Sequence, residues 1–223
     1  MCGRFYLDAE PSDLIEYFSV RLMLLSDREW RPRYNIAPSQ DVVIVRDTAD
    51  GRELVPARWG LVPHWSKEEK PKYSTINARA ETLAEKPTYR DSFKRRRCLF
   101  PASGFYEWKH VNDQKMPYLI RMPKGELMAF AGLWDRWDKD GKRFDSCSII
   151  VTSANTIMQA IHDRMPVILN PENYTDWLKS DNQDETFLKS MLVPYAGRLD
   201  IYPVSHHVNN PKNDDPSCTE KVR

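Results

Sequence analysis

The chain is poor in glycine and cysteine, and it lacks the short motifs that mark several large enzyme classes. Its eight glycines in 223 residues include neither G-x-x-x-x-G-K nor G-x-G-x-x-G, which excludes the common nucleotide-binding loops. The motifs H-E-x-x-H and G-x-S-x-G are also missing, so the usual zinc-peptidase and α/β-hydrolase interpretations do not apply. Any chemistry of this chain must therefore rest on another arrangement of side chains.

The four cysteines are too few and too far apart for a disulfide framework. Cys2, Cys98, Cys147 and Cys218 form no C-x-x-C pair and show no zinc-ligand spacing. We therefore expect free thiols, no metal and no cofactor. Free thiols are typical of a reducing compartment, where a reactive cysteine survives.

Long apolar runs and a large excess of one charge are also absent. No apolar stretch reaches about 18 residues, and the start of the chain lacks the basic-then-apolar pattern of a signal peptide. These absences predict a cytoplasmic protein without a membrane partner, and we expect a monomer. With 33 Lys and Arg against 32 Asp and Glu, any binding of nucleic acid must rest on a local basic groove.

The chain does contain ample material for a hydrophobic core. Hydrophobic residues make up 41% and aromatic residues 11%, which argues against global disorder. Because no repeat, low-complexity linker or boundary is visible, residues 1–223 are expected to form one domain with a polar tail from about residue 209. Many short strands with a few helices predict an α+β fold on a mainly antiparallel sheet.

Alternation, caps and turn signals predict the positions of the elements. Asp140-Gly141, between two apolar runs, is a hairpin signal, and the proline-rich residues 31–38 are expected to be extended. Strands are expected at 5–7, 42–45, 54–59, 98–100, 105–109, 118–121, 128–134, 144–152, 167–169 and 199–204. Helices are expected at 13–25, 77–86, 155–161, 170–177 and 185–192.

The start of the chain carries the most reactive group. Removal of Met1 would leave Cys2 with a free α-amine beside its thiol, with ordinary pKa values near ~8 and ~8.5. Such a 1,2-aminothiol captures aldehydes, because the amine forms a Schiff base and the sulfur then closes a thiazolidine ring. It also suits an N-terminal nucleophile. Alternatively, Cys2 is an incidental residue on a loose chain end.

Three polar clusters stand among apolar residues further along the chain. Asn77 begins an expected helix and is either its cap or a ligand-binding amide, while Arg79 could help to hold an anion. Glu107 lies between two aromatic residues on an expected strand, and burial would raise its pKa and suit it to proton transfer. His162 is either a structural histidine oriented by Asp163 or a general acid/base.

Two other features are compatible with nucleic acid binding. Trp65 lies in a proline-bounded loop, where it either packs or stacks on an unpaired base. The basic run at residues 94–97 is either a solvated face or a phosphate site.

Several blocks of the sequence, taken together and in order, resemble the SOS-response-associated peptidase (SRAP) family. The blocks are Met1-Cys2-Gly3-Arg4-Phe5, Tyr34-Asn35-Ile36-Ala37-Pro38, Arg58-Trp59-Gly60-Leu61-Val62-Pro63, Ile76-Asn77-Ala78-Arg79-Ala80-Glu81, Gly104-Phe105-Tyr106-Glu107-Trp108 and Ile161-His162-Asp163-Arg164-Met165-Pro166. The pattern continues into Pro203-Val204-Ser205 and Val208-Asn209-Asn210-Pro211-Lys212-Asn213. The resemblance covers nearly the whole chain and includes a motif that must lie at residue 2.

The resemblance implies a barrel-like fold and a sensor of abasic sites in single-stranded DNA. In this family the mature N-terminal cysteine forms a thiazolidine with the ring-opened sugar and shields the lesion from strand cleavage. Carried over, Cys2 would be the nucleophile and Asn77 would position the sugar. Glu107 would act as acid/base at the Schiff-base stage, and His162 would promote opening of the sugar ring. The implied DNA-binding residues are Arg4, Asn35, Trp65, Arg79, Trp108 and Arg164.

Three alternatives remain open at the level of sequence. A cysteine peptidase or autopeptidase would use Cys2 as nucleophile, Glu107 or His162 as base, and Asn77 as oxyanion donor. A non-covalent module would bind modified DNA without using the thiol. A structural protein would carry the thiol by chance. The residues also leave undecided whether Glu107 or His162 makes the first proton transfer.

Overall fold

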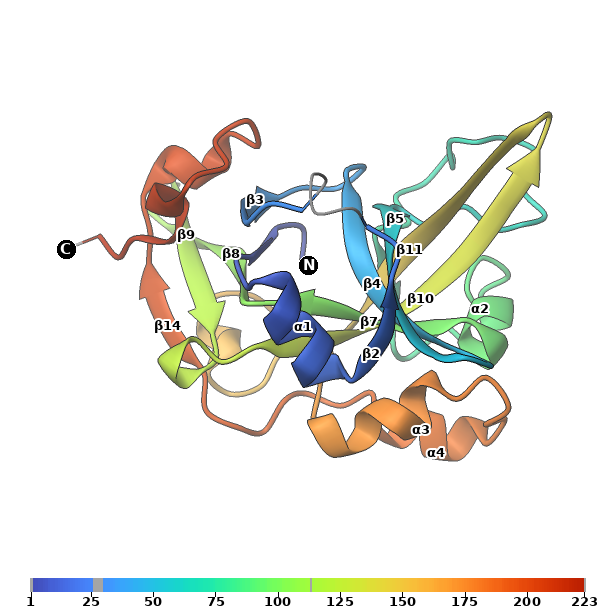
Figure 1. Cartoon of the computed structure of the whole chain (residues 1–223). Helices are drawn as coiled ribbons and strands as arrows, with labels where there is room; N and C mark the ends of the chain where they lie inside the picture. Colours follow the sequence, from blue (N-terminus) through green and yellow to red (C-terminus); the bar gives the residue numbers. More distant parts are fainter. Residues whose placement is uncertain (1, 26–29, 113, 223) are drawn as a thin grey trace.

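The computed structural model describes residues 2–25, 30–112 and 114–222, and two β-sheets make up most of it (Figure 1). The smaller sheet has the strand order β14-β9-β8-β1-β3, with every neighbouring pair antiparallel. Its strands are β14 (Asp200–Pro203), β9 (Gln114–Arg121), β8 (Gly104–Val111), β1 (Phe5–Leu7) and β3 (Arg33–Ile36).

The larger sheet closes on itself. Its path is β12 (Arg164–Pro166), β11 (Lys142–Ser153), β10 (Met128–Lys139), β7 (Arg97–Ala102), β4 (Asp41–Thr48), β5 (Gly51–Trp59) and β2 (Val20–Met23). β11 pairs with β10 on one side and, in parallel, with β5 on the other, so β5, β4, β7, β10 and β11 form a closed ring. The expected mainly antiparallel, barrel-like architecture is confirmed.

Two short strands extend the larger sheet. β13 (Ile168–Leu169) pairs with β10, and β6 (Asn77–Arg79) pairs with β11 in parallel. The β10–β11 hairpin turns at Asp140 and Gly141, whose φ angles of 52° and 75° are those of the two-residue turn that the Asp-Gly pair predicts.

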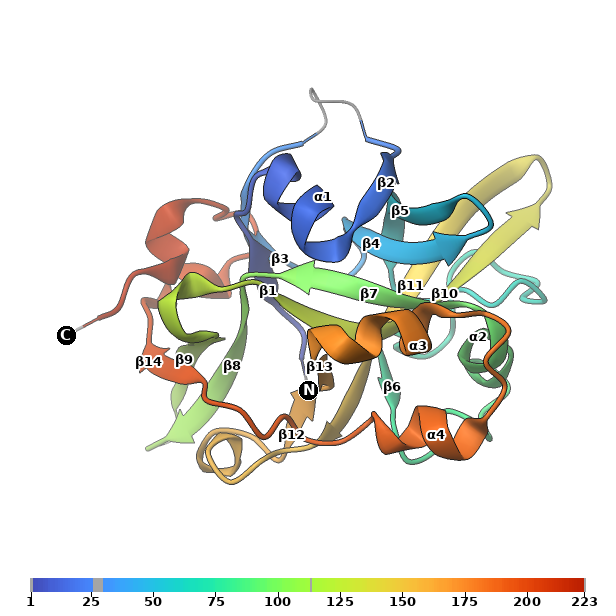
Figure 2. The same cartoon turned by 60° about the horizontal axis from the view of Figure 1, so that its bottom comes forward.

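Short helices flank the sheets, as Figures 1 and 2 show. α1 (Pro11–Phe18) contacts β2, α2 (Arg90–Arg95) contacts β10, and α3 (Tyr174–Leu178) contacts β7, while α4 (Glu185–Ser190) follows α3. Short 3₁₀ turns are η1 (Pro123–Gly125), η2 (Met158–Ala160), η3 (Pro171–Asn173), η4 (His206–Asn209) and η5 (Pro216–Thr219). Every helix in the described part of the chain is too short or too polar to span a bilayer.

Phe5 anchors the start of the chain in the core. Its ring lies edge-on to the rings of Trp59, Phe100 and Phe130, with centroids 5.3, 6.4 and 6.0 Å away. Such edge-to-face pairs add to the stabilisation from burial. Because β1 also pairs with β3 and β8, the beginning of the chain is fixed near the middle of the molecule (Figure 1).

Two of the expected helices are wrong or too long. The helix expected over residues 13–25 ends at Phe18, because Ser19 adopts a left-handed conformation (φ 52°) and β2 then pairs with β5. The helix expected from Asn77 is a strand instead, because residues 77–79 pair with β11 and fully bury Ala78. In both places pairing with a distant strand outweighs the local helix propensity.

The later helices differ in smaller ways. Residues 155–161 form only η2 rather than a longer helix. Asn170 does precede a helical segment with proline at its first position, but this segment begins as η3 and the Asn170 side chain makes no capping hydrogen bond. The helix expected over residues 185–192 is confirmed as α4.

Candidate active site

Cys2 is fully buried at the centre of the candidate site. Its backbone carbonyl accepts a hydrogen bond from Asn77 Nδ2 (2.9 Å). Burial raises the pKa of the Cys2 thiol far above its ordinary value, and the charge of Glu107 raises it further. The thiol is therefore protonated at neutral pH, so its chemistry needs a proton acceptor. Cys2 is therefore not part of a loose chain end, while Met1 lies outside the described residues.

Asn77 is presented by β6, whose parallel pairing with β11 sets its position. Its backbone carbonyl accepts a hydrogen bond from Tyr89 Oη (3.1 Å), which further fixes the strand. Its side-chain Oδ1 is buried and has no hydrogen-bond partner among the described residues. A buried acceptor of this kind is ready to receive a donor from a ligand.

Glu107 lies on β8 and is only 4% exposed. Side chains along this strand alternate between two faces: Phe105 packs in the main core, whereas Tyr106 and Trp108 pack in a second cluster on the other face. The influence of Glu107 on the Cys2 pKa places its carboxylate within electrostatic reach of the thiol. The two sheets therefore bring Cys2, Asn77 and Glu107 together: Asn77 comes from the larger sheet, and Cys2 and Glu107 come from the segment before β1 and from β8 of the smaller sheet.

His162 follows η2 and is partly exposed. The backbone N–H of Arg164 donates to His162 Nδ1 (3.0 Å), so in the neutral ring the proton sits on Nε2. Asp163 Oδ1 lies 2.8 Å from the same Nδ1. The Nδ1 edge of the ring is thus oriented by neighbouring groups of the chain.

The segment that carries His162 lies beside the segment that carries Asn77. β12 and β6 both pair with β11 around Val151. Arg164 Nη1 forms an ion pair with Glu81, two residues beyond Arg79. These contacts place the predicted residues of the two motifs on neighbouring parts of one sheet.

A broad open pocket of about 800 Å³ contains three of the predicted residues, Trp65, Asn77 and Arg79. The indole of Trp65 is 54% exposed, in agreement with an exposed loop position, and Tyr73 on the same rim is 84% exposed. Four lysines also line this pocket: Lys67, Lys70, Lys72 and Lys86. The sequence-based reasoning missed Tyr73, although an aromatic residue in a polar Lys-, Ser- and Pro-rich stretch was a usable signal.

Arg4, two residues after Cys2, contacts Trp108. The Arg4 guanidinium lies over the Trp108 ring, 5.6 Å from its centroid, and Trp108 Nε1 donates to Asn209 Oδ1 (2.7 Å). Arg4 Nη1 donates to the fully buried Asn35. Asn35 thus has no exposed surface with which to contact DNA directly.

The basic run at residues 94–97 divides into two environments. Lys94, Arg95 and Arg96 line a hollow of about 340 Å³ beside His64. Arg97 is buried instead, and its guanidinium donates to backbone carbonyls of the chain around α2 and α3, including those of Phe93 and Trp177. The expected solvated face therefore does not include Arg97, which cross-links backbone segments.

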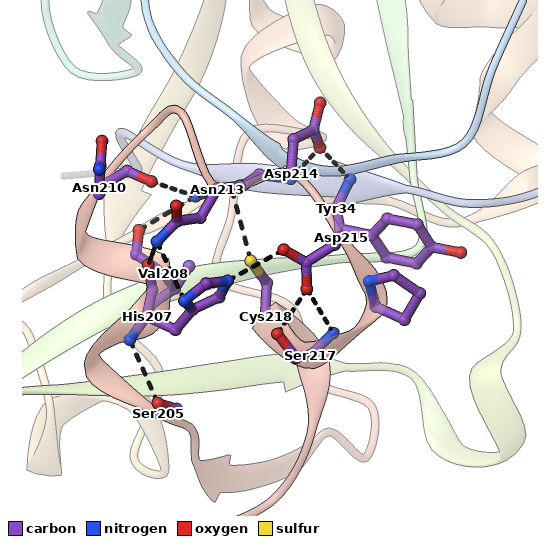
Figure 3. A network of polar contacts seen from close by, with 12 residues as sticks. Tyr34, Ser205, His207, Val208, Asn210, Asn213, Asp214, Asp215, Ser217 and Cys218 are labelled. Atoms are coloured by element: carbon purple, nitrogen blue, oxygen red, sulfur yellow. Dashed lines mark hydrogen bonds and ion pairs between the residues drawn. The ribbon is translucent and has the colours of Figure 1, made fainter.

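The C-terminal segment gathers three side chains of metal-ligand type. The ligand atoms of His207, Asp215 and Cys218 lie within 4.8 Å of one another. Each of them also has a hydrogen bond in the chain: His207 Nε2 with Asp215 (2.9 Å), Asp215 with Ser217, and Cys218 with a backbone carbonyl (Figure 3). These bonds account for the cluster as a polar network that closes the segment.

Comparisons with known proteins identify relatives of this chain. The chain is 45% identical to the abasic site processing protein YoqW of Bacillus subtilis over 223 residues, covering 99% of each chain. It is 32% identical to the abasic site processing protein HMCES of Xenopus tropicalis, covering all of this chain and 78% of that one. It is 29% identical to the abasic site processing protein YedK of Escherichia coli over the full length of both.

Solved structures and a family model lead to the same assignment. The fold superposes on the crystal structure of a Bacteroides thetaiotaomicron protein with a TM-score of 0.88. The two chains are 27% identical, and the match covers all of both. A Bordetella bronchiseptica protein gives a TM-score of 0.79 at 26% identity and covers 92% of this chain and all of that one. The model of the family described as SOS response associated peptidase (SRAP) matches residues 1–211. The chain therefore belongs to the SRAP family.

Proposed function

We propose that this chain recognises abasic sites in single-stranded DNA and links to them covalently through Cys2 after removal of Met1. The observation that carries the proposal is the burial of Cys2 between Asn77 and Glu107. The names of the relatives, abasic site processing proteins, supply the substrate class. An abasic site in its ring-opened form is an aldehyde, the partner that a 1,2-aminothiol captures.

The proposed reaction has two steps. The Cys2 amine attacks the C1′ aldehyde, and loss of one water gives a Schiff base. The thiol sulfur then adds to the imine carbon, the thiol proton passes to nitrogen, and a five-membered thiazolidine closes. Because the thiol is held protonated, this second step needs a base at the sulfur, and Glu107 is the carboxylate within electrostatic reach.

Asn77 and His162 take roles that follow from the chemistry of their side chains. Asn77 Oδ1 would accept a hydrogen bond from a sugar hydroxyl, while its Nδ2 keeps Cys2 in place. His162 Nε2–H would donate to the ring oxygen of the closed sugar and so promote its opening. This division gives the first proton transfer on the sugar to His162 and the later transfers to Glu107.

The DNA strand would cross the open pocket that contains Trp65. Arg79 and the four lysines of this pocket would contact phosphates, and Trp65 would stack on a base beside the lesion. Arg4, Arg164 and Trp108 would hold the strand on the two sides of Cys2. This local groove agrees with a net charge of only +1. We propose that one chain suffices, acting as a monomer in the cytoplasm.

A peptidase is the second candidate, and the buried thiol argues against it. Cysteine nucleophiles in peptidases react as thiolates, whose formation a lowered pKa promotes, whereas the pKa of Cys2 is raised. An aldehyde capture initiated by the amine does not require a thiolate at its first step. A non-covalent DNA-binding module is the third candidate, and it gives Cys2 no role.

The deciding experiment is a denaturing gel with single-stranded DNA that contains one abasic site. Wild type is expected to give a heat-stable protein–DNA band, and Cys2→Ala is expected to give none. Glu107→Ala should form the band much more slowly. A normal band with Cys2→Ala would exclude the proposal, and cleavage of peptides by wild type without DNA would favour the peptidase. Mass spectrometry of the purified protein shows whether Met1 is absent, because a retained Met1 should leave the chain inert.

A further inference from the structure

Within the described part of the chain, the groups that hold Arg4 in place are neutral. Its Nη1 donates to Asn35 Oδ1 (2.7 Å) and to the Val208 carbonyl (2.8 Å), and its guanidinium lies over the Trp108 ring. No carboxylate of the described residues lies within ion-pair distance of it. Half-burial lowers the pKa of Arg4, but an arginine remains charged at neutral pH. Its orientation is therefore fixed while its positive charge stays uncompensated.

Asn35 sets this orientation because its own amide can face only one way. Its Nδ2 donates to the carbonyls of Val208, Asn210 and Asn213, at 3.1, 3.0 and 2.6 Å. A turned amide would bring its oxygen against three carbonyl oxygens, so Oδ1 must point to Arg4. Asn35 is completely buried, which means that it acts on a ligand only through Arg4.

The three carbonyls come from the C-terminal segment, residues 205–219, which is fastened to β3. Asp214 Oδ1 accepts from the backbone N–H groups of Tyr34 (2.6 Å) and Asn35 (3.0 Å), as Figure 3 shows for Tyr34. Asp214 Oδ2 accepts from Arg33 Nε (2.6 Å). Charge-assisted bonds of this kind are the stronger ones in proteins. The loop beyond β14 is thereby locked against the strand that carries Asn35.

The loop is also closed from within. Asn213 Nδ2 donates to the His207 carbonyl (2.8 Å) and lies 3.0 Å from His207 Nδ1, while His207 Nε2 bonds Asp215 (Figure 3). These bonds hold the carbonyls of residues 208–213 in positions where they can accept hydrogen bonds from Asn35.

We propose that Asn35 and Asp214 are positioning residues that hold Arg4 beside Cys2 as an uncompensated cation for a DNA phosphate. The proposal rests on the function proposed above and extends it, because it makes the C-terminal segment part of the binding site. Arg4 is two residues from Cys2, and its backbone carbonyl accepts from Tyr106 N–H (3.0 Å), so its backbone is fixed as well. A phosphate that reaches Arg4 is therefore held at a set distance from the nucleophile.

The test measures binding without linkage. The probe is a single-stranded oligonucleotide with one tetrahydrofuran abasic analogue, which has no aldehyde, titrated at several salt concentrations. Asn35→Asp places a carboxylate on Arg4 and should weaken binding about tenfold at low salt, the loss of one charge-assisted contact. The slope of log K against log salt should fall by about 0.7, the value for one phosphate of a single strand.

A double variant and two further variants keep the test decisive. Arg4→Ala should show the same loss, and Arg4→Ala with Asn35→Asp should show no additional loss, because the second change acts through the first residue. Asp214→Asn preserves the shape and should weaken binding less than Asn35→Asp. Thr219→Ala lies on the same segment and its hydroxyl bonds only the Pro216 carbonyl, so it should bind as wild type does.

Two results would overturn the proposal. One is a folded Asn35→Asp variant, judged by circular dichroism, with wild-type affinity and salt slope. The other is an equal loss in Thr219→Ala, which would mean that any loosening of the segment matters. If Asn35→Asp fails to fold, additive losses in Arg4→Ala with Asp214→Asn would overturn it instead. The crosslink of wild type to a true abasic site tests the proposed function separately, so the two can fail independently.

Discussion

The surroundings of Cys2 and the pocket around Trp65 are built in opposite ways. Cys2, Asn77 and Glu107 stand on or beside paired strands, and Cys2 and Glu107 are almost completely buried. The pocket is open, and two of its aromatic rings, Trp65 and Tyr73, are more than half exposed. The first region is ordered by the core, while the second offers charge and ring faces to solvent.

This difference between the two regions suits one of them to the chemical steps and the other to binding of the DNA strand. Proton transfer and ring closure need atoms held to within fractions of an ångström, which packed strands supply. Binding of a flexible, anionic strand needs exposed cations and ring faces, which tolerate small displacements. Changes in the Cys2 region should therefore damage stability or rate, and changes in the pocket should damage affinity alone.

The largest effect is expected for Phe5→Ala. This change removes a buried ring that contacts three aromatic rings of the barrel, and it should lower the free energy of unfolding by about 3–5 kcal/mol. It should also abolish most crosslinking, because β1 anchors the segment that begins with Cys2. Urea unfolding followed by fluorescence measures the loss. Tyr73→Ala is the matched control, expected within about 0.5 kcal/mol of wild type.

Glu107→Gln should slow crosslinking with little change in DNA affinity. General acid/base catalysis is worth roughly 10²- to 10⁴-fold, so the rate constant should fall within that range while the affinity for the tetrahydrofuran probe stays the same. Removing the carboxylate also removes a charge that raises the Cys2 pKa, so this pKa should fall in the variant. A rate within threefold of wild type would assign the proton transfers elsewhere, with His162→Ala as the next variant to measure.

Much of the barrel follows from the sequence, because its strands are apolar runs bounded by turn signals and its long hairpin has an Asp-Gly turn. Residues 77–79 do not follow in this way. Ala78, Arg79 and Ala80 favour a helix, and only pairing with the distant β11 makes β6 a strand. The role proposed for Asn77 does not depend on the element that carries it, because it rests on the hydrogen bond of the side chain to Cys2.

The buried polar contacts could not be predicted from single blocks. Asp214 and Asn35 are 179 residues apart, and nothing local shows that they bond each other. Arg97 belongs to a basic run whose composition is typical of a protein surface. It is nevertheless buried, because backbone carbonyls from distant residues accept hydrogen bonds from its guanidinium. Such contacts arise only once the fold has closed, whereas reactive groups such as Cys2 are visible from chemistry alone.

The raised pKa of Cys2 predicts that the rate of its alkylation changes little with pH. A free cysteine becomes a thiolate as the pH passes about 8.5, and its alkylation accelerates. The pKa values of Cys2, Cys98 and Cys147 are all raised by burial, so iodoacetamide labelling of the native protein should stay slow between pH 7 and 9. Labelling should become fast in urea. Fast labelling of Cys2 in the native state, located by mass spectrometry, would contradict its enclosed position.

Trp65→Ala should weaken binding of the single strand by about 1–3 kcal/mol, the contribution of one stacked base. Stability should hardly change, because the ring is 54% exposed. Trp65→Phe keeps a ring face and should recover part of the affinity, which distinguishes stacking from a general effect on the loop. Equal affinities for wild type, Trp65→Ala and Trp65→Phe would show that Trp65 does not contact the DNA.

The smallest effects on DNA binding are expected for Arg79 and Arg164, which differ in their ion-pair partners. Arg164 is paired with Glu81, whereas Arg79 has no carboxylate within ion-pair distance among the described residues. Arg79→Ala should therefore reduce the salt slope by about 0.7, and Arg164→Ala by less, because a phosphate must first displace Glu81. Glu81→Gln should tighten binding by releasing Arg164, but only while Arg164 is present. If Arg79→Ala and Arg164→Ala reduce the salt slope equally, then Glu81 must dissociate from Arg164 when the DNA strand binds. The Arg164–Glu81 ion pair would then exist only in the DNA-free protein.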